Sequence, residues 1–183
     1  MIACIGWGSL IWDKRDLDVD GEWRDNGPML PVEFARQSSD GRITLVLVRG
    51  FAPVPTLWSR FNTGDLARAR ESLRQREGVP RSRAGDLIAH WHRDENPVAE
   101  PYATISPWAA GMDLEAAVWT NLPPKFGGID ERVPTENEVV AYLRALQGEA
   151  GAAAEQYVRQ APRQIATAYR RAIEGALGWT PMD

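Results

Sequence analysis

The sequence predicts an α+β fold organised as a single domain. Short apolar runs typical of β-strands occupy most of the first two thirds of the chain, whereas helical patterns dominate the last third. Of the residues, 44% are hydrophobic and 25% charged, which is ordinary for a globular domain. The length of 183 residues is too short for two well-packed hydrophobic cores. We therefore expect one domain over residues 1–183.

The strand patterns begin at the N-terminus. Residues 1–5 are an apolar run that predicts a short buried strand, and this run ends at a glycine-rich segment. Two further runs, 30–35 and 43–48, are separated by a polar turn at 38–41, which predicts an antiparallel hairpin. Three more strands are expected downstream, so that the middle of the chain is mostly sheet: 85–92, 101–105 and 115–120.

A first helix is expected over residues 65–77. Its composition favours helix, and Asn62 or Thr63 precedes it as a candidate N-cap. Gly78 supplies the end of the helix, because glycine readily adopts the left-handed conformation found at many helix C-termini.

Three helices are expected in the last third of the chain. Residues 135–138 read Thr-Glu-Asn-Glu, a capping-box sequence, and apolar residues then recur at helical spacing: Val139, Leu143 and Leu146. The alanine-rich remainder predicts helices over 152–160 and 163–177. Pro162 divides them, because proline lacks the amide donor and clashes inside a helix.

Charge and cysteine content narrow the classes of partner and compartment. The formal net charge is -4 and the isoelectric point is near 5.3, which disfavours nucleic acid and anionic membrane surfaces as partners. The single cysteine, Cys4, forms no internal disulfide, and the N-terminus lacks a signal-peptide pattern, so we expect a cytoplasmic protein. No apolar stretch approaches the roughly 20 residues that cross a bilayer.

The chain has eight tryptophans and four phenylalanines, an inverted aromatic ratio. Tryptophan combines a large apolar face with an N–H donor that needs a partner when buried. Two uses stay open: core and self-association surface, which would allow a homodimer, or aromatic walls of a pocket.

The segment Gly6-Trp7-Gly8-Ser9-Leu10 follows the first predicted strand and is a candidate binding loop. It lacks the lysine of a phosphate loop and the third glycine of a dinucleotide fingerprint, so it does not predict a nucleotide site. Closely spaced glycines can instead expose a row of backbone N–H donors to a carboxylate or a developing oxyanion. A plain tight turn is the alternative.

Glu77 is the most informative single residue. On the predicted helix it lies on the apolar stripe of Leu66 and Leu73, and it falls in the last turn, where the helix dipole disfavours negative charge. These surroundings favour a functional carboxylate over a structural one. The alternative is an ion pair at the rim with one of three basic neighbours: Arg74, Arg76 or Arg81. Glu71 faces away from the stripe and is expected to be solvated.

The remaining reactive side chains point to no second site. His90 and His92 share one face of a strand, but no cysteine or carboxylate completes a zinc set, so we expect no metal. Cys4 fits a small buried hydrophobe, and Ser9 has no assigned histidine partner. Three arginines on the last helix are expected on a solvated face: Arg163, Arg170 and Arg171.

Two segments resemble the ChaC-like gamma-glutamylcyclotransferases. Residues 5–12, Ile-Gly-Trp-Gly-Ser-Leu-Ile-Trp, resemble the Gly-Tyr-Gly-Ser-Leu-Ile-Trp opening of that family, and residues 73–78 resemble its Leu-x-x-Arg-Glu segment, with similar spacing between the two. Weaker similarity covers 117–121 with 126–128, and the helix bearing Tyr157. The sequence departs from the family where Trp7 replaces a tyrosine and where Gly-Val-Pro follows Glu77.

The resemblance implies a gamma-glutamylcyclotransferase-like fold, a small mixed β-barrel with surrounding helices. It also implies a cofactor-free enzyme that cleaves a gamma-glutamyl amide, glutathione or a relative, to 5-oxoproline and an amine or peptide. Glu77 would be the catalytic acid and base, and the substrate would bind the backbone amides of Trp7, Gly8, Ser9 and Leu10, with Tyr157 at the pocket wall. A non-catalytic ligand-binding or assembly protein on the same fold is the alternative.

Overall fold

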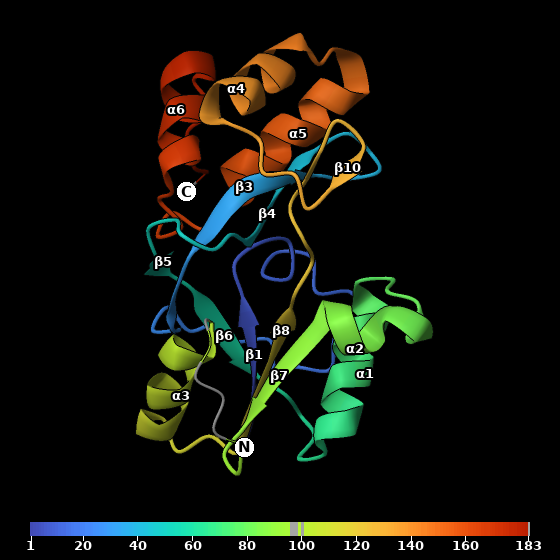
Figure 1. Cartoon of the computed structure of the whole chain (residues 1–183), viewed down its shortest axis with the longest axis vertical. Coiled ribbons are helices and arrows are strands. Elements are labelled where there is room, and N and C mark those ends of the chain that lie inside the picture. The colour runs from blue at the N-terminus through green and yellow to red at the C-terminus, as the bar shows by residue number, and fades with distance from the viewer. Residues whose placement is uncertain (96–98, 100, 183) are drawn as a thin grey trace. The chain divides into compact units, whose positions relative to one another are not determined.

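The computed structural model describes residues 1–95, 99 and 101–182 (Figure 1). The chain divides into two compact units, each assembled from three segments. The first unit contains Met1–Gly6, Leu10–Leu30 and Pro55–Leu122, and the second contains Trp7–Ser9, Pro31–Val54 and Pro123–Asp183. The α+β class is confirmed, while the single domain stays a prediction.

The first unit is built on a four-stranded sheet in the order β6-β1-β8-β7. Its strands are β1 (Ile2–Gly6), β6 (Leu57–Arg60), β7 (Ile88–His92) and β8 (Ala116–Thr120). Strand β1 is antiparallel to β6 and parallel to β8, and it is buried along its whole length because it lies in the middle of the sheet. The predicted strands at 1–5 and 115–120 are confirmed.

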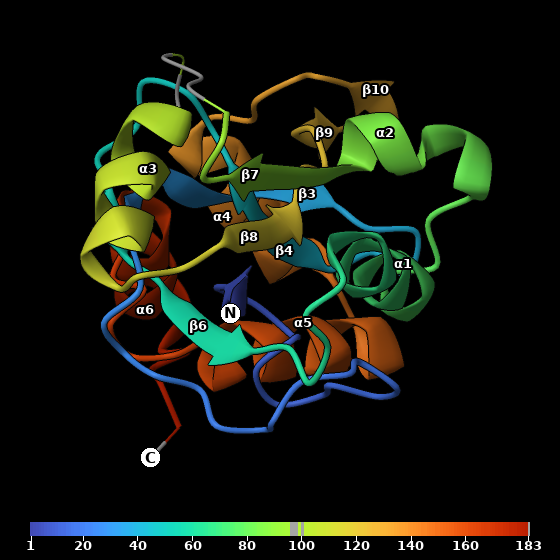
Figure 2. The same cartoon turned by 90° about the horizontal axis from the view of Figure 1, so that it is seen from below.

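Two helices cover opposite faces of this sheet, as Figures 1 and 2 show: α1 (Leu66–Arg76) and α3 (Tyr102–Gly111). On the α1 face, alternate strand residues and the apolar stripe of the helix form one core, which includes Cys4, Val118, Ala69 and Leu73. On the α3 face, the ring of Tyr102 packs edge-on against Trp119 with centroids 5.5 Å apart. The sheet is therefore buried on both faces.

The sequence-based prediction for the middle of the chain is partly wrong. Residues 101–105 are not a strand but the beginning of α3. Ile105 and Ala109 lie one helical turn apart, and both are buried in the first unit. The predicted strand 85–92 begins only at Ile88, after the short helix α2 (Ala84–Leu87) and a 3-10 turn at Arg81–Arg83.

Helix α1 begins and ends through local hydrogen bonds. Asp65 is its N-cap, accepting from the amides of Ala67 and Arg68, so the prediction of Asn62 or Thr63 is wrong. An aspartate in that position satisfies two of the free amides of the first turn.

The second unit contains the four-stranded sheet β10-β9-β3-β4. Its strands are β3 (Val32–Gln37), β4 (Ile43–Leu47), β9 (Lys125–Phe126) and β10 (Ile129–Asp130). The predicted antiparallel hairpin is confirmed by the pairing of β3 with β4, and Gly41 (φ +84°) completes its turn.

A third sheet pairs the short strands β2 (Met29–Leu30) and β5 (Val54–Pro55). None of the three sheets closes on itself within the described residues, so the predicted mixed β-barrel is not observed. Among the described residues, β6 and β7 are the outer strands of their sheet, and the hairpin of β3 and β4 pairs with β9.

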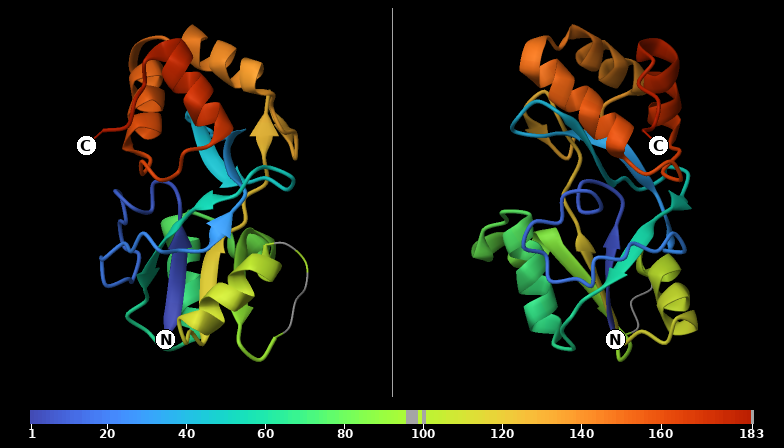
Figure 3. Two further views of the ribbon diagram at one scale, coloured as in Figure 1. Left: turned by 90° about the vertical axis from the view of Figure 1, so that its left-hand side faces the viewer. Right: turned by 180° about the vertical axis from the view of Figure 1, so that it is seen from behind.

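Three helices lie on one side of the second unit's large sheet (Figure 3): α4 (Glu136–Ala145), α5 (Gly148–Gln160) and α6 (Ala168–Leu177). The capping box at the start of α4 is confirmed, since the Thr135 side chain accepts from Glu138 N and the Glu138 side chain accepts from Thr135 N. No helix of the described residues is long and apolar enough to span a membrane.

The predicted helix 163–177 forms only from Ala168, where Thr167 is the N-cap. The carboxylate of Glu33 on β3 is buried at this helix start and accepts from Tyr169 N at 3.2 Å and from the Thr167 hydroxyl. A helix N-terminus favours a negative charge, so a side chain from the sheet fixes where α6 begins.

Arg170 is buried, which contradicts its predicted place on a solvated face. Its side chain is 1% exposed and donates to four backbone carbonyls at the end of α5 and in the connection to α6: Val158, Ala161, Pro162 and Ile165. It also pairs with Glu174 at 3.1 Å. The carbonyls at a helix end lack intrahelical partners, and the five guanidinium N–H groups satisfy them here.

Candidate functional site

Glu77 is held at the C-terminal end of α1 by the backbone. Gly78 (φ +65°) donates its N–H to Gln75 O and Val79 donates to Arg74 O, both at 3.0 Å. This pair of bonds is a Schellman motif, and the accompanying apolar contact is present, because Val79 packs into the same core as Leu73. The predicted glycine stop is confirmed, and Glu77 is the C-cap residue.

The Glu77 side chain is mostly buried, with 15% of it exposed. Its Oε1 accepts from Arg76 Nη1 at 2.6 Å, and no described residue donates a hydrogen bond to Oε2. The charge of Glu77 also reaches β1: burial raises the pKa of the Cys4 thiol, and the Glu77 carboxylate raises it further. One oxygen of a largely buried carboxylate is thus fixed while the other has no protein partner among the described residues.

Arg76 is the ion-pair partner of Glu77 and is itself 4% exposed. Its Nε and Nη2 both donate to the backbone carbonyl of Asp13, at 3.2 and 2.5 Å. Of the basic neighbours considered from the sequence, Arg76 is therefore the partner, but the pair is buried and not at an exposed rim.

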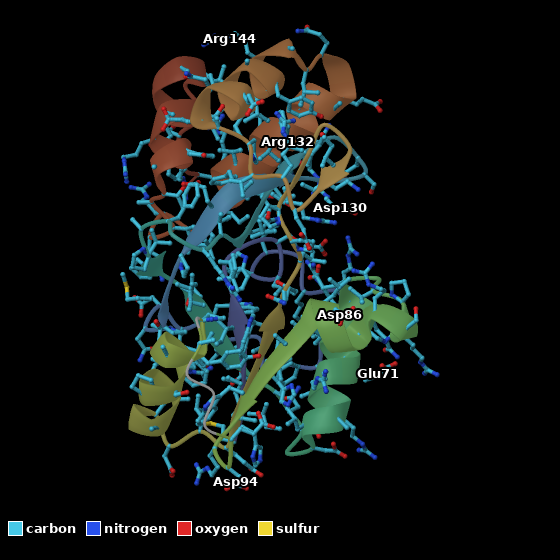
Figure 4. The ribbon with its side chains drawn as sticks, viewed as in Figure 1. Glu71, Asp86, Asp94, Asp130, Arg132 and Arg144 are labelled. Carbon is cyan, nitrogen blue, oxygen red and sulfur yellow. The ribbon has the colours of Figure 1, made fainter. Side chains whose placement is uncertain are left out.

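Glu71, labelled on α1 in Figure 4, is ion-paired in addition to being partly exposed. Arg74 Nε lies 2.7 Å and Arg81 Nη2 3.5 Å from its carboxylate oxygens. The hydrogen bonds from Arg74 lower the pKa of Glu71 to about 2. Helix α1 and its C-cap therefore carry two carboxylates in different settings: Glu71 is partly exposed among arginines, and Glu77 is mostly buried beside Arg76.

The glycine-rich loop leaves β1 as a turn. Trp7 is buried, and its indole N–H donates to the carbonyl of Leu45 on β4 at 3.2 Å. Gly8 faces Tyr157 of α5: a Cβ atom at Gly8 would lie 2.7 Å from the Tyr157 hydroxyl oxygen. That hydroxyl in turn accepts from the amide of Leu45 at 3.3 Å. The structure thus brings Trp7, Gly8 and Tyr157 together around one residue of β4.

Both glycines of the loop are required by space and not by backbone conformation. Neither Gly6 nor Gly8 has a left-handed φ. A Cβ atom at Gly6 would lie 2.7 Å from the ring of Trp23, as close as the Gly8 contact with Tyr157. The two glycines therefore allow the loop to pack closely against Trp23 and Tyr157.

The predicted site residues fall into two groups. Trp7, Gly8, Ser9 and Tyr157 belong to the second unit. Leu10 and Glu77 belong to the first, where Leu10 packs in the core that also holds Leu73 and Val79. The chain itself connects the groups, because the loop begins at Gly6 and returns to the first unit at Leu10.

Arg42 is a charged residue beside Tyr157 that no pattern in the sequence indicates. Its guanidinium carbon lies 5.4 Å from the centroid of the Tyr157 ring, and Nη2 pairs with Asp40 at 2.7 Å. Its Nε is buried and has no hydrogen-bond partner among the described residues. Arg42 follows the turn of a hairpin, and such a position carries no pattern that would mark it as functional.

Each of the two histidines lies near an acid: His90 Nε2 lies 3.7 Å from Glu95, and His92 Nδ1 lies 3.6 Å from Asp94. Burial, with the charge of Arg70, lowers the pKa of His90. Across residues 1–95, 99 and 101–182, no group of three or more side chains could hold a metal ion. No protein-family model matches the sequence, and no curated protein is significantly similar to it.

Proposed function

We propose that this protein is a cofactor-free, cytoplasmic gamma-glutamylcyclotransferase. It cleaves a gamma-glutamyl amide, glutathione or a related compound, to 5-oxoproline and a free amine or peptide. The observation that carries the proposal is Glu77, at the position that resembles the family's catalytic glutamate. It is a mostly buried carboxylate with Oε1 fixed, and Oε2 has no hydrogen-bond donor among the residues that the structure describes.

The reaction needs a proton acceptor that later becomes a donor. The α-amine of the substrate attacks its own γ-carbonyl carbon, the new C–N bond closes the five-membered ring, and the original amide C–N bond breaks. Oε2 of Glu77 takes the proton from the attacking amine and returns it to the leaving nitrogen. General acid-base catalysis of this kind contributes about 10²- to 10⁴-fold in rate.

The loop residues supply the second requirement, a set of fixed donors for the glutamyl group and the oxyanion. Trp7 is anchored to β4 through its indole N–H, and Gly8 is packed against the Tyr157 hydroxyl, so the backbone between them is held on both sides. The indole N–H of Trp7 thereby makes a structural hydrogen bond to Leu45, at the position where the family has a tyrosine with its hydroxyl donor.

We also propose that the chain has the gamma-glutamylcyclotransferase-like fold, on the basis of the two similar segments and the α+β class. The open sheets differ from the barrel that the resemblance implies. A non-catalytic ligand-binding or assembly protein is the second candidate. The Arg76–Glu77 ion pair favours it, because a carboxylate paired to an arginine can serve stability alone.

The deciding experiment incubates the purified protein with a panel of gamma-glutamyl compounds and measures 5-oxoproline. Glu77→Gln keeps the shape of the side chain and removes the proton acceptor, so kcat is expected to fall by about 10²- to 10⁴-fold with KM within a few-fold. Glu71→Gln is the matched control, because Glu71 lies on the same helix and is also ion-paired. It should leave kcat unchanged. Wild-type turnover in folded Glu77→Gln protein would refute Glu77 as the proton acceptor. Absence of 5-oxoproline with every compound in the wild-type protein would favour the non-catalytic candidate.

A further inference from the structure

We propose that Arg76 is a positioning residue, which fixes the Glu77 carboxylate relative to the chain that leaves the glycine-rich loop. The kinetic part of this inference rests on the proposed function, whereas the contact itself does not. Arg76 donates to Glu77 Oε1 through one nitrogen and to Asp13 O through two others. Asp13 directly follows Trp12, the last residue of the segment that resembles the family's opening loop.

The geometry is specific to this guanidinium. Adjacent residues on a helix do not face each other, so the contact between Arg76 and Glu77 does not follow from their being neighbours in sequence. The Arg76 side chain is turned toward Glu77 because the Asp13 carbonyl holds its Nε and Nη2. Only the planar fork of arginine can serve both acceptors together, since the lysine ammonium is a compact point charge on a flexible stem.

A second contact strengthens the link on the other side. Arg15 Nη1 donates to the carbonyl of Arg76 at 3.5 Å, and Arg15 Nε pairs with Asp13 Oδ2 at 3.2 Å. The segment after the loop and the end of α1 therefore exchange hydrogen bonds in both directions. A displacement of either the segment or the helix end is transmitted to the other through hydrogen bonds, and those of Arg76 are mostly buried.

This arrangement assigns a task to each oxygen of Glu77. Arg76 holds Oε1, and the same contact determines the direction in which Oε2 points. Catalytic groups must be placed to within a fraction of an ångström, and a misplacement of about 1 Å costs about 10²-fold in rate. Arg76 touches no reacting atom in this mechanism, so its loss is expected to lower kcat while KM stays within a few-fold.

The kinetic test compares Arg76→Ala and Arg76→Lys with the wild type on the gamma-glutamyl compound that it turns over best. We expect kcat to fall by about 10- to 100-fold in Arg76→Ala and by less in Arg76→Lys. Guanidinium ion at millimolar, non-denaturing concentration should restore part of the kcat of Arg76→Ala. The matched control is Arg68→Ala on the exposed side of the same helix, which should show neither loss nor rescue.

Wild-type kcat in both Arg76 variants would overturn the inference. So would an equal loss in both folded variants that guanidinium ion does not restore. If Arg76→Ala does not fold, Arg76→Lys carries the test: a reduced kcat with unchanged KM supports positioning, and wild-type kcat refutes it.

A stability measurement separates this inference from the proposed function. Urea unfolding of Arg76→Met, Glu77→Gln and the double variant should show that the two substitutions together shift the midpoint less than the sum of their separate shifts. Additive shifts would refute the coupling between the two side chains. If the wild-type protein forms no 5-oxoproline from any compound, the proposed function fails while this cycle still tests the contact.

Discussion

Replacing Gly8 by alanine tests how the glycine-rich loop is held. The backbone of Gly8 has no left-handed φ, so alanine adds no backbone strain there, and the whole effect is the added methyl group. That methyl would lie 2.7 Å from the Tyr157 hydroxyl oxygen and 3.7 Å from the ring carbon that bears it. The first distance is far inside normal contact, and the second is ordinary packing.

The expected cost of Gly8→Ala is about 1–3 kcal/mol in the free energy of unfolding, the usual range for overpacking a close contact. Tyr157→Phe removes the hydroxyl, leaving the ring carbon as the nearest atom. By itself this change loses the bond from Leu45 N and costs about 1 kcal/mol. In the double variant the methyl occupies the space of the hydroxyl, so most of the overpacking cost should disappear.

The assay is urea unfolding of the four proteins of the cycle, followed by tryptophan fluorescence. We expect the double variant to be more stable than the sum of the single effects predicts, by about 1–3 kcal/mol. Additive effects would mean that Gly8 and Tyr157 are not in contact. In that case Tyr157 does not support the loop, whatever the protein's activity.

Two further predictions concern stability. Arg170→Met is expected to lower the free energy of unfolding by about 3–5 kcal/mol, because it leaves four backbone carbonyls, three of them in buried hydrogen bonds, without their donor; a calorimetric Tm close to wild type would contradict this. Burial raises the pKa of Glu33 above its ordinary value of 4.5, so the folded state holds the proton more tightly and stability should decline as pH rises from about 4.5 toward the folded pKa. Glu33→Gln stays neutral and should flatten that decline in urea titrations across pH, and an unchanged slope would exclude Glu33 as its cause.

Local signals in the sequence predicted local structure well. The capping box at Thr135 and the glycine stop at Gly78 both depend on residues a few positions apart, and both are confirmed. The strand expected at 101–105 is a helix, because a short apolar run fits either conformation until its tertiary packing decides. Sheet closure was equally beyond the sequence, since it depends on which edges pair across long separations.

The candidate site divides in the same way. The position of Glu77 on the apolar side of a helix end followed from periodicity, and the structure places it there, mostly buried. The burial of Arg76 depends on the Asp13 carbonyl, which is 63 residues away along the chain, so no local pattern indicates it. Arg170 was expected in solvent for the related reason that charged residues are seldom fully buried unless they find partners.

The network around Arg170 also bears on the order of folding. Its most distant backbone acceptor, Val158, is only 12 residues away, whereas the bond from Tyr169 N to Glu33 at the start of the same helix spans 136 residues. Short chain closures cost little entropy and form early, and long ones wait until more of the chain is ordered. The corner between α5 and α6 can therefore form before the helices dock on β3. Arg170→Met should accordingly slow refolding more than it speeds unfolding, and stopped-flow chevron plots showing the opposite partition would place this corner late in the pathway.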